Sequence, residues 1–343
     1  MNLLFIFIFF SLLTFLLTYI CRTLAFKFNI LDIPGERKIH EFPTPLLGGL
    51  AIYVSVISGL IFGPVGLTKV LGLVISSTII FTVGIIDDIR DLSAEIRLAA
   101  QLIASFIVMI FGVSISFLPN DSYGRLGEII LTYIWIIGIT NALNYLDGVD
   151  GLAAGITAIC AGFFLVISYH TGQILVSFIS IIIMAGCLGF LPHNFKRDKI
   201  FLGDGGSTFL GFSIACLAIM GDWAEYNVIS LVTPVLILGI PIFDMVFTTI
   251  MRIKERKIKT VIEWFEYAST DHFHHRLMHL GMGPRGVVVF IYCINISLGI
   301  GALMVSNEKP LIGFLSILQG VIIFTLIAIL TVLGKRQSIK VKD

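Results

Sequence analysis

The chain has 343 residues, of which 57% are hydrophobic and 13% are charged, and its formal net charge is +1. A soluble domain could not bury that much apolar surface, and apolar runs of about 20 residues recur along the chain. The composition excludes a soluble globular enzyme and predicts an all-α, polytopic integral membrane protein, because long apolar helices satisfy their own backbone in lipid.

The spacing of the apolar runs predicts eleven membrane-spanning helices and places the two termini on opposite sides. In chain order the predicted spans are residues 3–26, 47–63, 69–86, 95–117, 127–143, 151–170, 173–191, 205–221, 228–251, 287–305 and 310–333. Residues 1–20 hold no Lys or Arg and no small-residue cleavage site, so we expect the first span to be retained rather than removed as a signal peptide. No internal repeat or linker stands out, and we expect one domain over 1–343.

Basic residues are distributed unevenly between the loops. Of the 23 Lys and Arg residues, 20 fall on one predicted side, and the other side has only Lys69, Arg125 and Lys309. The positive-inside rule then predicts an outside N-terminus and a cytoplasmic C-terminus. The sizeable polar clusters also fall on the predicted cytoplasmic side, at 32–45, 87–93, 141–151, 192–207 and 252–286. A one-sided distribution indicates a single cytoplasmic site.

The first polar loop runs from Asp32 to His40 and continues to Gly49. Its basic residues Arg37, Lys38 and His40 could bind phosphates. Ordinary positive-inside charge, with Pro and Gly that form the loop, explains the same residues equally well.

The third predicted span ends in adjacent carboxylates, Asp87 and Asp88, followed by Asp91. Carboxylates at a helix C-terminus oppose the helix dipole, so helix stability does not explain them. Asp87 and Asp91 would face together if the helix continued, although Asp91 or Ser93 could instead cap the next helix. We expect these carboxylates to partner a divalent cation or a basic residue.

Four polar residues recur at every third position after the fifth span, and they are Asn141, Asn144, Asp147 and Asp150. Steps of three residues cannot keep all four on one helical face. Gly148 and Gly151 indicate that the helix ends within the motif. We therefore expect the two Asn on the helix and the two Asp beyond its end, turned toward a common centre.

The sequence Phe201-Leu-Gly-Asp204-Gly-Gly-Ser opens the eighth span. Asp204 could be a simple N-cap, but a Gly-rich helix start can also present backbone N–H groups to an anion while the Asp holds its metal. The preceding stretch 192–200, which includes Asn194, offers base-stacking and phosphate-binding candidates. Together they favour a nucleotide site.

Two further features, Asp244 and the His-rich loop 271–279, lie in the C-terminal third of the sequence. Asp244 falls within the ninth predicted span, where a carboxylate is a functional-site candidate, although it could pair with Arg252. The loop 271–279 holds four His around Arg276; this pattern suits phosphate, and zinc is the weaker alternative because no HExxH and no nearby Cys is present. Residues 260–267 resemble an interfacial amphipathic helix.

Oxygen ligands, basic groups and Gly-rich turns on one membrane face fit Mg²⁺ bound by carboxylates and substrate phosphates. They predict phosphoryl transfer between a cytosolic substrate and a lipid phosphate. The rivals are a transporter with intramembrane carboxylates, which predicts polar residues near the bilayer midplane, and a zinc hydrolase built on the His loop.

Five motifs in order, from about Asp32 to Gly281, resemble the bacterial polyprenyl-phosphate N-acetylhexosamine-1-phosphate transferases of glycosyltransferase family 4. The motifs are Pro-Gly-Glu-Arg-Lys-Ile-His, Asp87-Asp88-x-x-Asp91, Asn141-x-x-Asn144-x-x-Asp-Gly-x-Asp-Gly, Phe201-Leu-Gly-Asp204-Gly-Gly-Ser and His274-His275-Arg276-Leu. Asp91 and the His-His-Arg form are similar to the N-acetylglucosamine-transferring branch. The branch that transfers a muramoyl-pentapeptide typically has Lys and a His triplet at these places.

The resemblance implies transfer of N-acetylglucosamine 1-phosphate from UDP-GlcNAc to undecaprenyl phosphate, with release of UMP, as the first step of a cell-envelope polysaccharide at the bacterial cytoplasmic membrane. Another UDP-N-acetylhexosamine is the alternative donor. It also implies Mg²⁺, or Mn²⁺, as cofactor, no nucleic-acid partner, and a homodimer as one assembly to test. The polymer that is started, such as a teichoic acid or lipopolysaccharide, stays open.

The resemblance also assigns expected roles to individual residues. It implies metal ligation by Asn144 and Asp204, and catalysis by Asp87, Asp88 and Asp91 near the reacting phosphate. The expected substrate-binding residues are Arg37, Lys38, His40, Asn141, Asp147, Asp150, Asn194, His272, His274, His275 and Arg276. A phosphate monoester is already largely ionised at neutral pH, so we favour direct in-line attack by the lipid phosphate over an aspartyl-phosphate intermediate on Asp87.

Overall fold

The computed structural model describes residues 2–33, 42–63, 67–196, 199–223, 227–260, 263, 271–305 and 310–340. The chain forms two compact units, Met1–Gly221 (unit 1) and Asp222–Asp343 (unit 2), and each is described by itself. The expectation of one domain over 1–343 stays a prediction.

The described residues of unit 1 form a bundle of eight helices with one short strand pair. Its elements are α1 (Leu3–Lys27), β1 (Leu31–Asp32), β2 (Thr44–Pro45), α2 (Gly48–Phe62), α3 (Leu67–Arg90), α4 (Ala94–Ile110), α5 (Ser122–Leu146), α6 (Leu152–His170), α7 (Ile174–Asn194) and α8 (Gly203–Met220). Unit 2 holds α9 (Asn227–Ile237), α10 (Gly239–Lys254), α12 (Phe273–His279), α13 (Pro284–Val305) and α14 (Pro310–Lys340).

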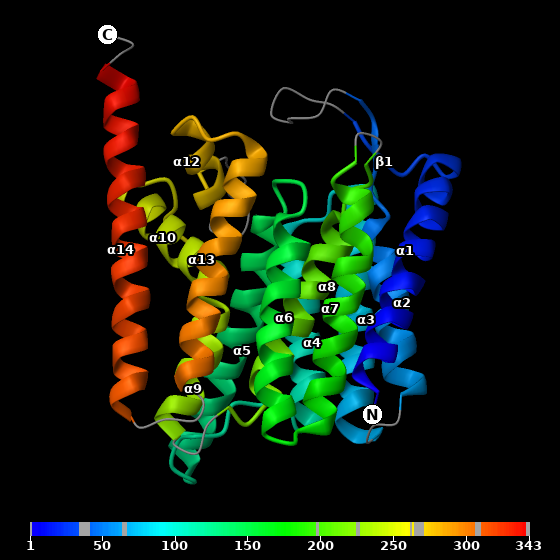
Figure 1. Cartoon of the computed structure of the whole chain (residues 1–343), viewed down its shortest axis with the longest axis horizontal. Coiled ribbons are helices and arrows are strands. Elements are labelled where there is room, and N and C mark those ends of the chain that lie inside the picture. Colours follow the sequence, from blue (N-terminus) through cyan, green and yellow to red (C-terminus); the bar gives the residue numbers. More distant parts are fainter. Residues whose placement is uncertain are drawn as a thin grey trace. The chain divides into compact units, whose positions relative to one another are not determined.

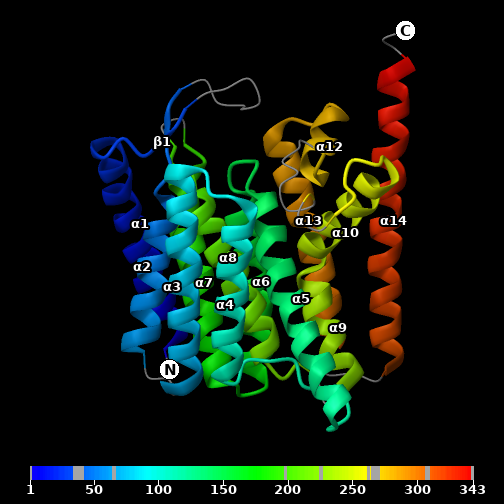
Figure 2. The same cartoon turned by 180° about the vertical axis from the view of Figure 1, so that it is seen from behind.

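Helix α8 is the centre of unit 1. It contacts α2, α3, α5, α6 and α7, and the views in Figures 1 and 2 show it enclosed by these helices. Of the most apolar stretch of α8, 78% is buried inside the protein, whereas the corresponding share for α1 is 11%. Burial of an apolar helix all round is expected only for a core helix. The polar residues at the start of α8 are therefore held by the surrounding helices.

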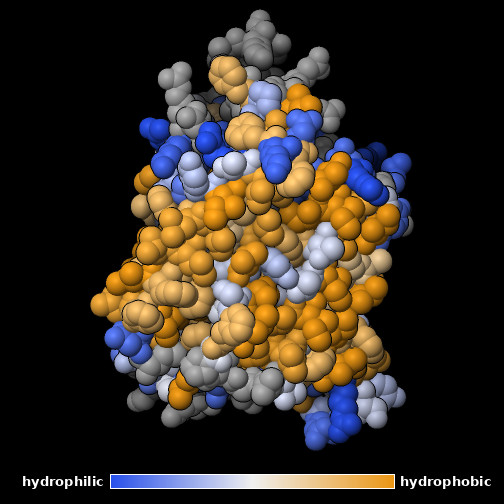
Figure 3. All heavy atoms as spheres, turned by 90° about the vertical axis from the view of Figure 1, so that its right-hand side faces the viewer, coloured by the Kyte–Doolittle hydropathy of each residue, from blue (hydrophilic) through white to orange (hydrophobic). Residues whose placement is uncertain are grey.

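The outer surface to which α1 contributes is apolar. Figure 3 shows a broad hydrophobic band on this side, with hydrophilic residues gathered at its two edges. Large side chains of α1 such as Leu4, Phe5 and Tyr19 contribute, each more than half exposed. A soluble protein does not expose a continuous apolar band of this kind, whereas a membrane protein needs one to face lipid.

Eight described helices are long and apolar enough to span a membrane, and the bent pair α9–α10 could form a ninth span. Two further predicted spans coincide with α2 and α4, which have only 15 and 17 residues. The prediction of an all-α, multi-pass membrane protein is confirmed. The count of eleven spans and the orientation of the termini stay predictions.

Two predicted spans differ from the structure. The span 228–251 is broken near Leu238 into α9 and α10, which are bent by 78°. Pro241 lies at the start of α10, where its missing N–H removes a bond that a continuous helix would require. The span 95–117 ends earlier, at Ile110, because Gly112 adopts a left-handed conformation with φ of +86° and stops the helix.

Helices α1 to α8 run alternately up and down in Figures 1 and 2. The C-terminal ends of α3, α5 and α7 therefore lie at the same end of unit 1 as the N-terminal end of α8. Hydrogen bonds across this end connect Asp88, Asn144 and Asp204. We call it the acidic end, and the motifs that hold Asp88, Asn144 and Asp204 meet there.

Candidate functional site

The N-terminus of α8 is capped by a carboxylate from α3. Asp88 accepts hydrogen bonds from the backbone N–H groups of Asp204 at 2.7 Å and Gly205 at 3.1 Å. Free N–H groups and the positive end of the helix dipole favour an anion at this place. Asp204 therefore lies in the first turn of α8 rather than acting as its N-cap, and Asp88 fixes the position of that turn.

The glycines at the start of α8 allow its backbone to touch two other helices. A Cβ at Gly49 of α2 would lie 2.2 Å from the Cα of Gly206, and a Cβ at Gly84 of α3 would lie 2.5 Å from the Cα of Gly205. Only glycine permits such approaches. The Gly-rich start of α8 thus brings three helices together, and two of its N–H groups bind Asp88 rather than being open to a phosphate.

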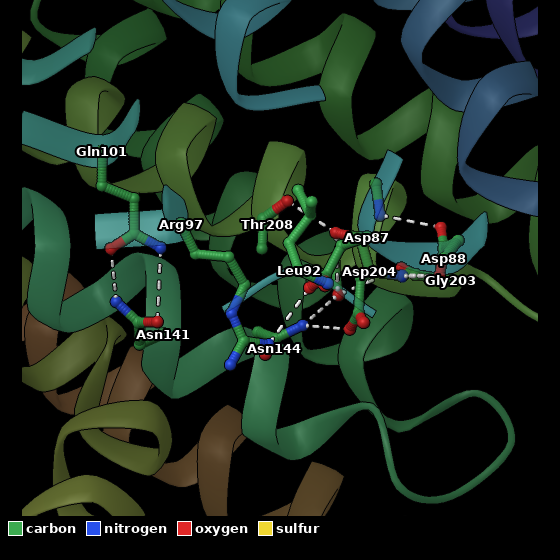
Figure 4. Close-up of polar contacts among 12 residues, drawn as sticks. Asp87, Asp88, Leu92, Arg97, Gln101, Asn141, Asn144, Gly203, Asp204 and Thr208 are labelled. Atoms are coloured by element: carbon green, nitrogen blue, oxygen red, sulfur yellow. Dashed lines mark hydrogen bonds and ion pairs between the residues drawn. The ribbon is translucent and has the colours of Figure 1, made fainter. Parts of the chain in front are cut away.

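Asn144 and Asp204 lie in direct contact. The Nδ2 of Asn144, near the end of α5, donates to Oδ1 of Asp204 at 2.7 Å and to Oγ of Ser207 at 2.9 Å. Figure 4 shows the two side chains meeting beside Asp87 and Asp88. Both residues are partly exposed.

Asp87 is held by the following turn and by a cation. Its Oδ1 accepts the N–H of Leu92 at 2.7 Å, and its Oδ2 pairs with Arg97 of α4 at 3.1 Å. Asp91 is exposed and has a left-handed backbone with φ of +47°, just after α3 ends at Arg90. The condition for a common helical face of Asp87 and Asp91, a helix that continues through both, is therefore not met.

The loop after α5 adds two more carboxylates. Burial raises the pKa of Asp147 well above its ordinary value, and the negative charges of Asp204, Asp88 and Asp150 raise it further. Asp150 pairs with Lys199 at 2.7 Å, and the ammonium of Lys199 also lies over the ring of Phe201. Together with Asp87, five carboxylates therefore interact at the acidic end, and their combined negative charge favours a bound cation.

Two predicted substrate residues of unit 1 instead join segments of the protein. Asn141 exchanges hydrogen bonds with Gln101 of α4, away from the carboxylates in Figure 4. Asn194 accepts the N–H of Gly151 and donates to the carbonyl of Ile200 at 2.8 Å. Both side chains are buried, and the contacts favour a structural role for each; their binding role stays a prediction.

Unit 2 contains a second polar cluster, at the start of α12. The carboxylate of Asp244, fully buried in α10, contacts Nδ1 of His272 at 2.8 Å and accepts the N–H of Phe273 at 2.6 Å. A structural role for Asp244 predicts a pair with Arg252. Instead it caps α12 and holds the imidazole that precedes it.

Arg252 pairs with Asp271 in a two-bond fork, at 2.7 Å and 3.1 Å, and its side chain is 1% exposed. Burial of the Asp271 carboxyl works against ionisation, but the hydrogen bonds and charge of Arg252 outweigh it and lower the pKa of Asp271. The backbone carbonyl of Asp271 accepts Nε of Arg276 at 2.6 Å. The guanidinium of Arg276 also lies over the ring of Phe247.

Two imidazoles of this cluster are uncharged at neutral pH. Burial lowers the pKa of His274 to about 3, with further lowering from His275 and His272. Burial and the neighbouring His272 and His279 also lower the pKa of His275. Neither ring nitrogen of His274 has a hydrogen-bond partner among the described residues, although the ring is fully buried. An unpaired buried imidazole is costly and suits a site completed by a ligand or water.

Residues 70–222 match the family model described as glycosyl transferase family 4. A Bacillus subtilis protein named "Probable undecaprenyl-phosphate N-acetylglucosaminyl 1-phosphate transferase" is 35% identical over 328 residues, which cover 94% of this chain and 90% of that protein.

This chain belongs to glycosyl transferase family 4.

Two further relatives of this family-4 chain are similar over most of their length. The decaprenyl-phosphate N-acetylglucosaminephosphotransferase of Mycolicibacterium smegmatis is 31% identical, over 82% of this chain and 77% of that protein. The undecaprenyl-phosphate alpha-N-acetylglucosaminyl 1-phosphate transferase of Escherichia coli K12 is 29% identical over the same shares. The names are those of transferases, so the comparisons do not favour the transporter reading.

The structure brings one group of the predicted site residues together. Asp87, Asp88, Asn144, Asp147 and Asp204 gather at the acidic end, although they come from α3, α5, α8 and a loop. His272, His274, His275 and Arg276 lie together in unit 2. Arg37, Lys38 and His40 lie outside the described residues, as does most of 260–267.

Sequence reasoning missed three residues that contact the predicted site of this family-4 chain. Arg97 binds Asp87, Lys199 binds Asp150, and Ser207 shares the amide of Asn144. Arg97 carried a usable signal, because a basic residue inside an apolar predicted span needs a partner. Lys199 and Ser207 carried none beyond their proximity to Asp204 in sequence.

The acidic end has the donor chemistry for a magnesium ion. Among the described residues no three His, Cys, Asp or Glu side chains converge on one point as a metal site. Asn144 and Asp204 instead offer an amide oxygen and a carboxylate, with surplus negative charge around them. Mg²⁺ commonly takes only one or two carboxylates and completes its shell with water and substrate phosphates. The residues therefore fit Mg²⁺ better than a closed structural zinc site.

Proposed function

We propose that this chain transfers N-acetylglucosamine 1-phosphate from UDP-GlcNAc to undecaprenyl phosphate and releases UMP. The contact between Asn144 and Asp204 within a group of carboxylates carries the proposal. It supports a magnesium site of the kind that phosphate substrates complete. The names of the relatives bring the sugar donor and the polyprenyl phosphate acceptor to this proposal. Another UDP-N-acetylhexosamine is the alternative donor.

In the proposed reaction an oxygen of the lipid phosphate attacks the β-phosphorus of the donor. The bond from this phosphorus to the bridging oxygen breaks, and the oxygen leaves with UMP. Both reactants are anions, so their repulsion must be reduced. Mg²⁺, held by Asn144 and Asp204, would neutralise phosphate charge when bound. The guanidinium of Arg276 would bind phosphate through its two terminal nitrogens.

Asp87 and Asp88 are proposed to position groups rather than to attack phosphorus. Both oxygens of Asp87 are engaged by Leu92 and Arg97, and both oxygens of Asp88 accept N–H groups of α8. A carboxylate that is already hydrogen-bonded in this way is a weaker nucleophile than a free one. The lipid phosphate is itself largely ionised at neutral pH, since its second pKa is about 6. A strong general base would therefore add little.

The Asp87→Ala variant separates the direct route from the two-step route. The direct route predicts residual product formation at a reduced rate, since Asp87 holds Arg97 and forms no bond to phosphorus. Purified variant, UDP-GlcNAc and undecaprenyl phosphate are incubated with Mg²⁺, and lipid-linked product is measured. Loss of all product, together with a phosphorylated protein trapped in the wild type, would support the aspartyl-phosphate route instead.

We also propose eleven membrane spans with an outside N-terminus and a cytoplasmic C-terminus, in the bacterial cytoplasmic membrane. The supporting observation is that the acidic end lies at the same end of unit 1 as Lys27, Arg90 and Lys199. Lys69 and Arg125 lie at the opposite helix ends. Labelling of single cysteines placed at residues 69 and 199, with a membrane-impermeant reagent in intact cells, tests this orientation. Labelling at 199 and protection at 69 would reverse it.

The function is tested by UMP release. Purified protein, undecaprenyl phosphate and Mg²⁺ are incubated with a panel of UDP-sugars. We expect UMP release with UDP-GlcNAc that depends on the lipid, and none with UDP-glucose. Asp121→Asn is a matched control, because Asp121 caps α5 at the opposite end of unit 1 and Asn caps helices equally well. No release with any UDP-N-acetylhexosamine would overturn the proposal.

A further inference from the structure

Four side chains that support α12 in unit 2 are connected by an unbroken series of hydrogen bonds. Asp244 contacts His272, His272 contacts Arg252, and Arg252 pairs with Asp271. The backbone of Asp271 then binds Arg276. Three of these contacts are between side chains that are at most 10% exposed. We call this set the α12 support.

The contacts assign the proton on His272. Arg252 can only donate, so Nε2 of His272, 3.2 Å away, must accept. The proton of the neutral ring is then on Nδ1 and is donated to Oδ2 of Asp244, at 2.8 Å. The other oxygen of Asp244 accepts the N–H of Phe273. Both nitrogens of His272 are engaged inside the unit, so His272 serves α12 better than it serves a substrate.

At its far end, the α12 support fixes the orientation of the Arg276 guanidinium through Asp271. Nε of Arg276 is bound to the carbonyl of Asp271, and the Phe247 ring lies 5.2 Å from the guanidinium carbon. These contacts restrict the plane of the guanidinium. The two terminal nitrogens of an Arg side chain can together donate a pair of hydrogen bonds to one phosphate, so the orientation of the guanidinium plane matters for binding. Movement of Asp271 would turn this plane.

The α12 support is poorly explained by stability alone. A buried ionic chain contributes less to stability than apolar packing of the same volume, because each charge loses its hydration. Its directional bonds do fix the rotation of α12, a helix of only seven residues that could not hold its own position. Orientation is therefore what the chain of contacts supplies.

We propose that Asp244 is a positioning residue for donor binding: through His272, Arg252 and Asp271 it holds α12 and orients Arg276 toward the donor pyrophosphate. The inference rests on the proposed function, in which Arg276 binds that pyrophosphate. Asp244 itself does not touch the substrate. A positional error of about 1 Å can cost a reaction about 100-fold, so a distant carboxylate can control the rate.

A double-mutant cycle between Asp244→Asn and Arg276→Ala tests the coupling. Asn offers one acceptor where Asp offers two, so it cannot accept from both His272 and Phe273. We expect Asp244→Asn to lower kcat/KM for UDP-GlcNAc by roughly 10- to 100-fold, mainly through KM, with the KM for undecaprenyl phosphate unchanged. In the Arg276→Ala background the same change should cost less than about twofold, because the group that it positions is gone.

The control is Thr249→Val in the same helix, whose hydroxyl donates to the carbonyl of Met245 in its own helix. It should keep wild-type kinetics. If Asp244→Asn fails to fold, Arg252→Lys takes its place in the cycle, because Lys keeps the charge and loses the fork onto Asp271. Additive losses in the double variant, or an unchanged KM for UDP-GlcNAc in the single variant, would overturn the inference.

Hydrogen exchange gives a second test that does not need activity. Asp244→Asn should raise the exchange rate of amides 273–279 by roughly tenfold or more, while the amides of α13 keep wild-type rates. Unchanged exchange in α12 would overturn the positioning role. If the wild type releases no UMP from any UDP-N-acetylhexosamine, the proposed function fails, and the exchange result still decides whether Asp244 holds α12.

Discussion

The acidic end of unit 1 and the α12 support of unit 2 both gather Asp residues, but they balance charge differently. In the α12 support each carboxylate has its own polar or cationic partner: Asp244 has His272, and Asp271 has Arg252. At the acidic end five carboxylates interact with one another, and among the described residues two of them form ion pairs there, Asp87 with Arg97 and Asp150 with Lys199.

The physical consequence is visible in ionisation. The pKa of Asp271 is lowered by its partner, whereas the pKa of Asp147 is raised by burial and by neighbouring carboxylates. A group whose charge is matched inside the protein stabilises a fixed geometry. A group of carboxylates with surplus negative charge needs positive charge from a ligand, and a divalent cation supplies it. The comparison separates a candidate metal site from a framework that presents Arg276.

The largest expected effect is removal of the metal. Treatment with EDTA should abolish UMP release, because the surplus carboxylates would then repel both phosphate substrates. Mg²⁺ or Mn²⁺ should restore the rate, and Zn²⁺ should not, since the donors are oxygens. Initial rates across a metal titration measure this. Restoration by Zn²⁺ alone would favour the zinc hydrolase reading and remove the distinction between the two regions.

Substitution at the metal pair should have the next effect. Asp204→Asn should reduce kcat/KM by roughly 10³-fold, since a preorganised group that stabilises developing charge contributes about this much. It should also raise the Mg²⁺ concentration needed for half-maximal rate. Asp121→Asn is the control at the opposite end of unit 1. A normal Mg²⁺ requirement in Asp204→Asn would contradict metal ligation by Asp204.

The matched charges of unit 2 predict a loss of stability instead. Arg252→Gln leaves the Asp271 carboxylate without its fork, and breaking a buried ion pair costs about 3 kcal/mol or more. The double variant Arg252→Gln/Asp271→Asn should recover part of this loss, because no unpaired charge remains. Thermal unfolding in detergent measures both. Equal stability of Arg252→Gln and the wild type would show that the pair is not a framework contact.

A pH-dependent effect on stability should come from His274. Its pKa is about 3 in the folded protein and 6.5 in its ordinary state, so between these values the unfolded chain binds a proton that the folded chain does not. Stability should therefore fall as the pH falls from 6.5 toward 3, by up to about 1.4 kcal/mol per pH unit for one proton. His274→Leu should flatten the slope, with His275 keeping a part of it. An unchanged slope would mean that His274 does not titrate in this way.

Much of the fold followed from local pattern. Apolar runs of membrane length located the helices, because length and hydropathy are properties of each segment alone. The break near Leu238 could not be predicted from the sequence. Pro241 is compatible with the start of a new helix, but it is also compatible with a kink inside one continuous span. The early end of α4 depended on the left-handed backbone of Gly112.

The composition of the candidate site followed from the motifs, but its connections did not. Asp88 and Asp204 are 116 residues apart, and nothing local indicates that one caps the helix of the other. The Gly-rich start of α8 predicts a cradle for an anion, whereas its glycines are required by contact with Gly49 and Gly84. Long-range contacts of this kind depend on how the helices pack, which the order of motifs does not specify.

Asn144 and Asp204 are proposed to share one divalent ion. Anomalous diffraction from crystals grown with Mn²⁺ tests it most directly, because Mn²⁺ substitutes for Mg²⁺ and is located by its own signal. We expect one peak in contact with an oxygen of each side chain, and no peak in Asp204→Asn crystals. A peak bound by Asp88 or Asp147 without Asn144, or one that persists in the variant, would contradict the account.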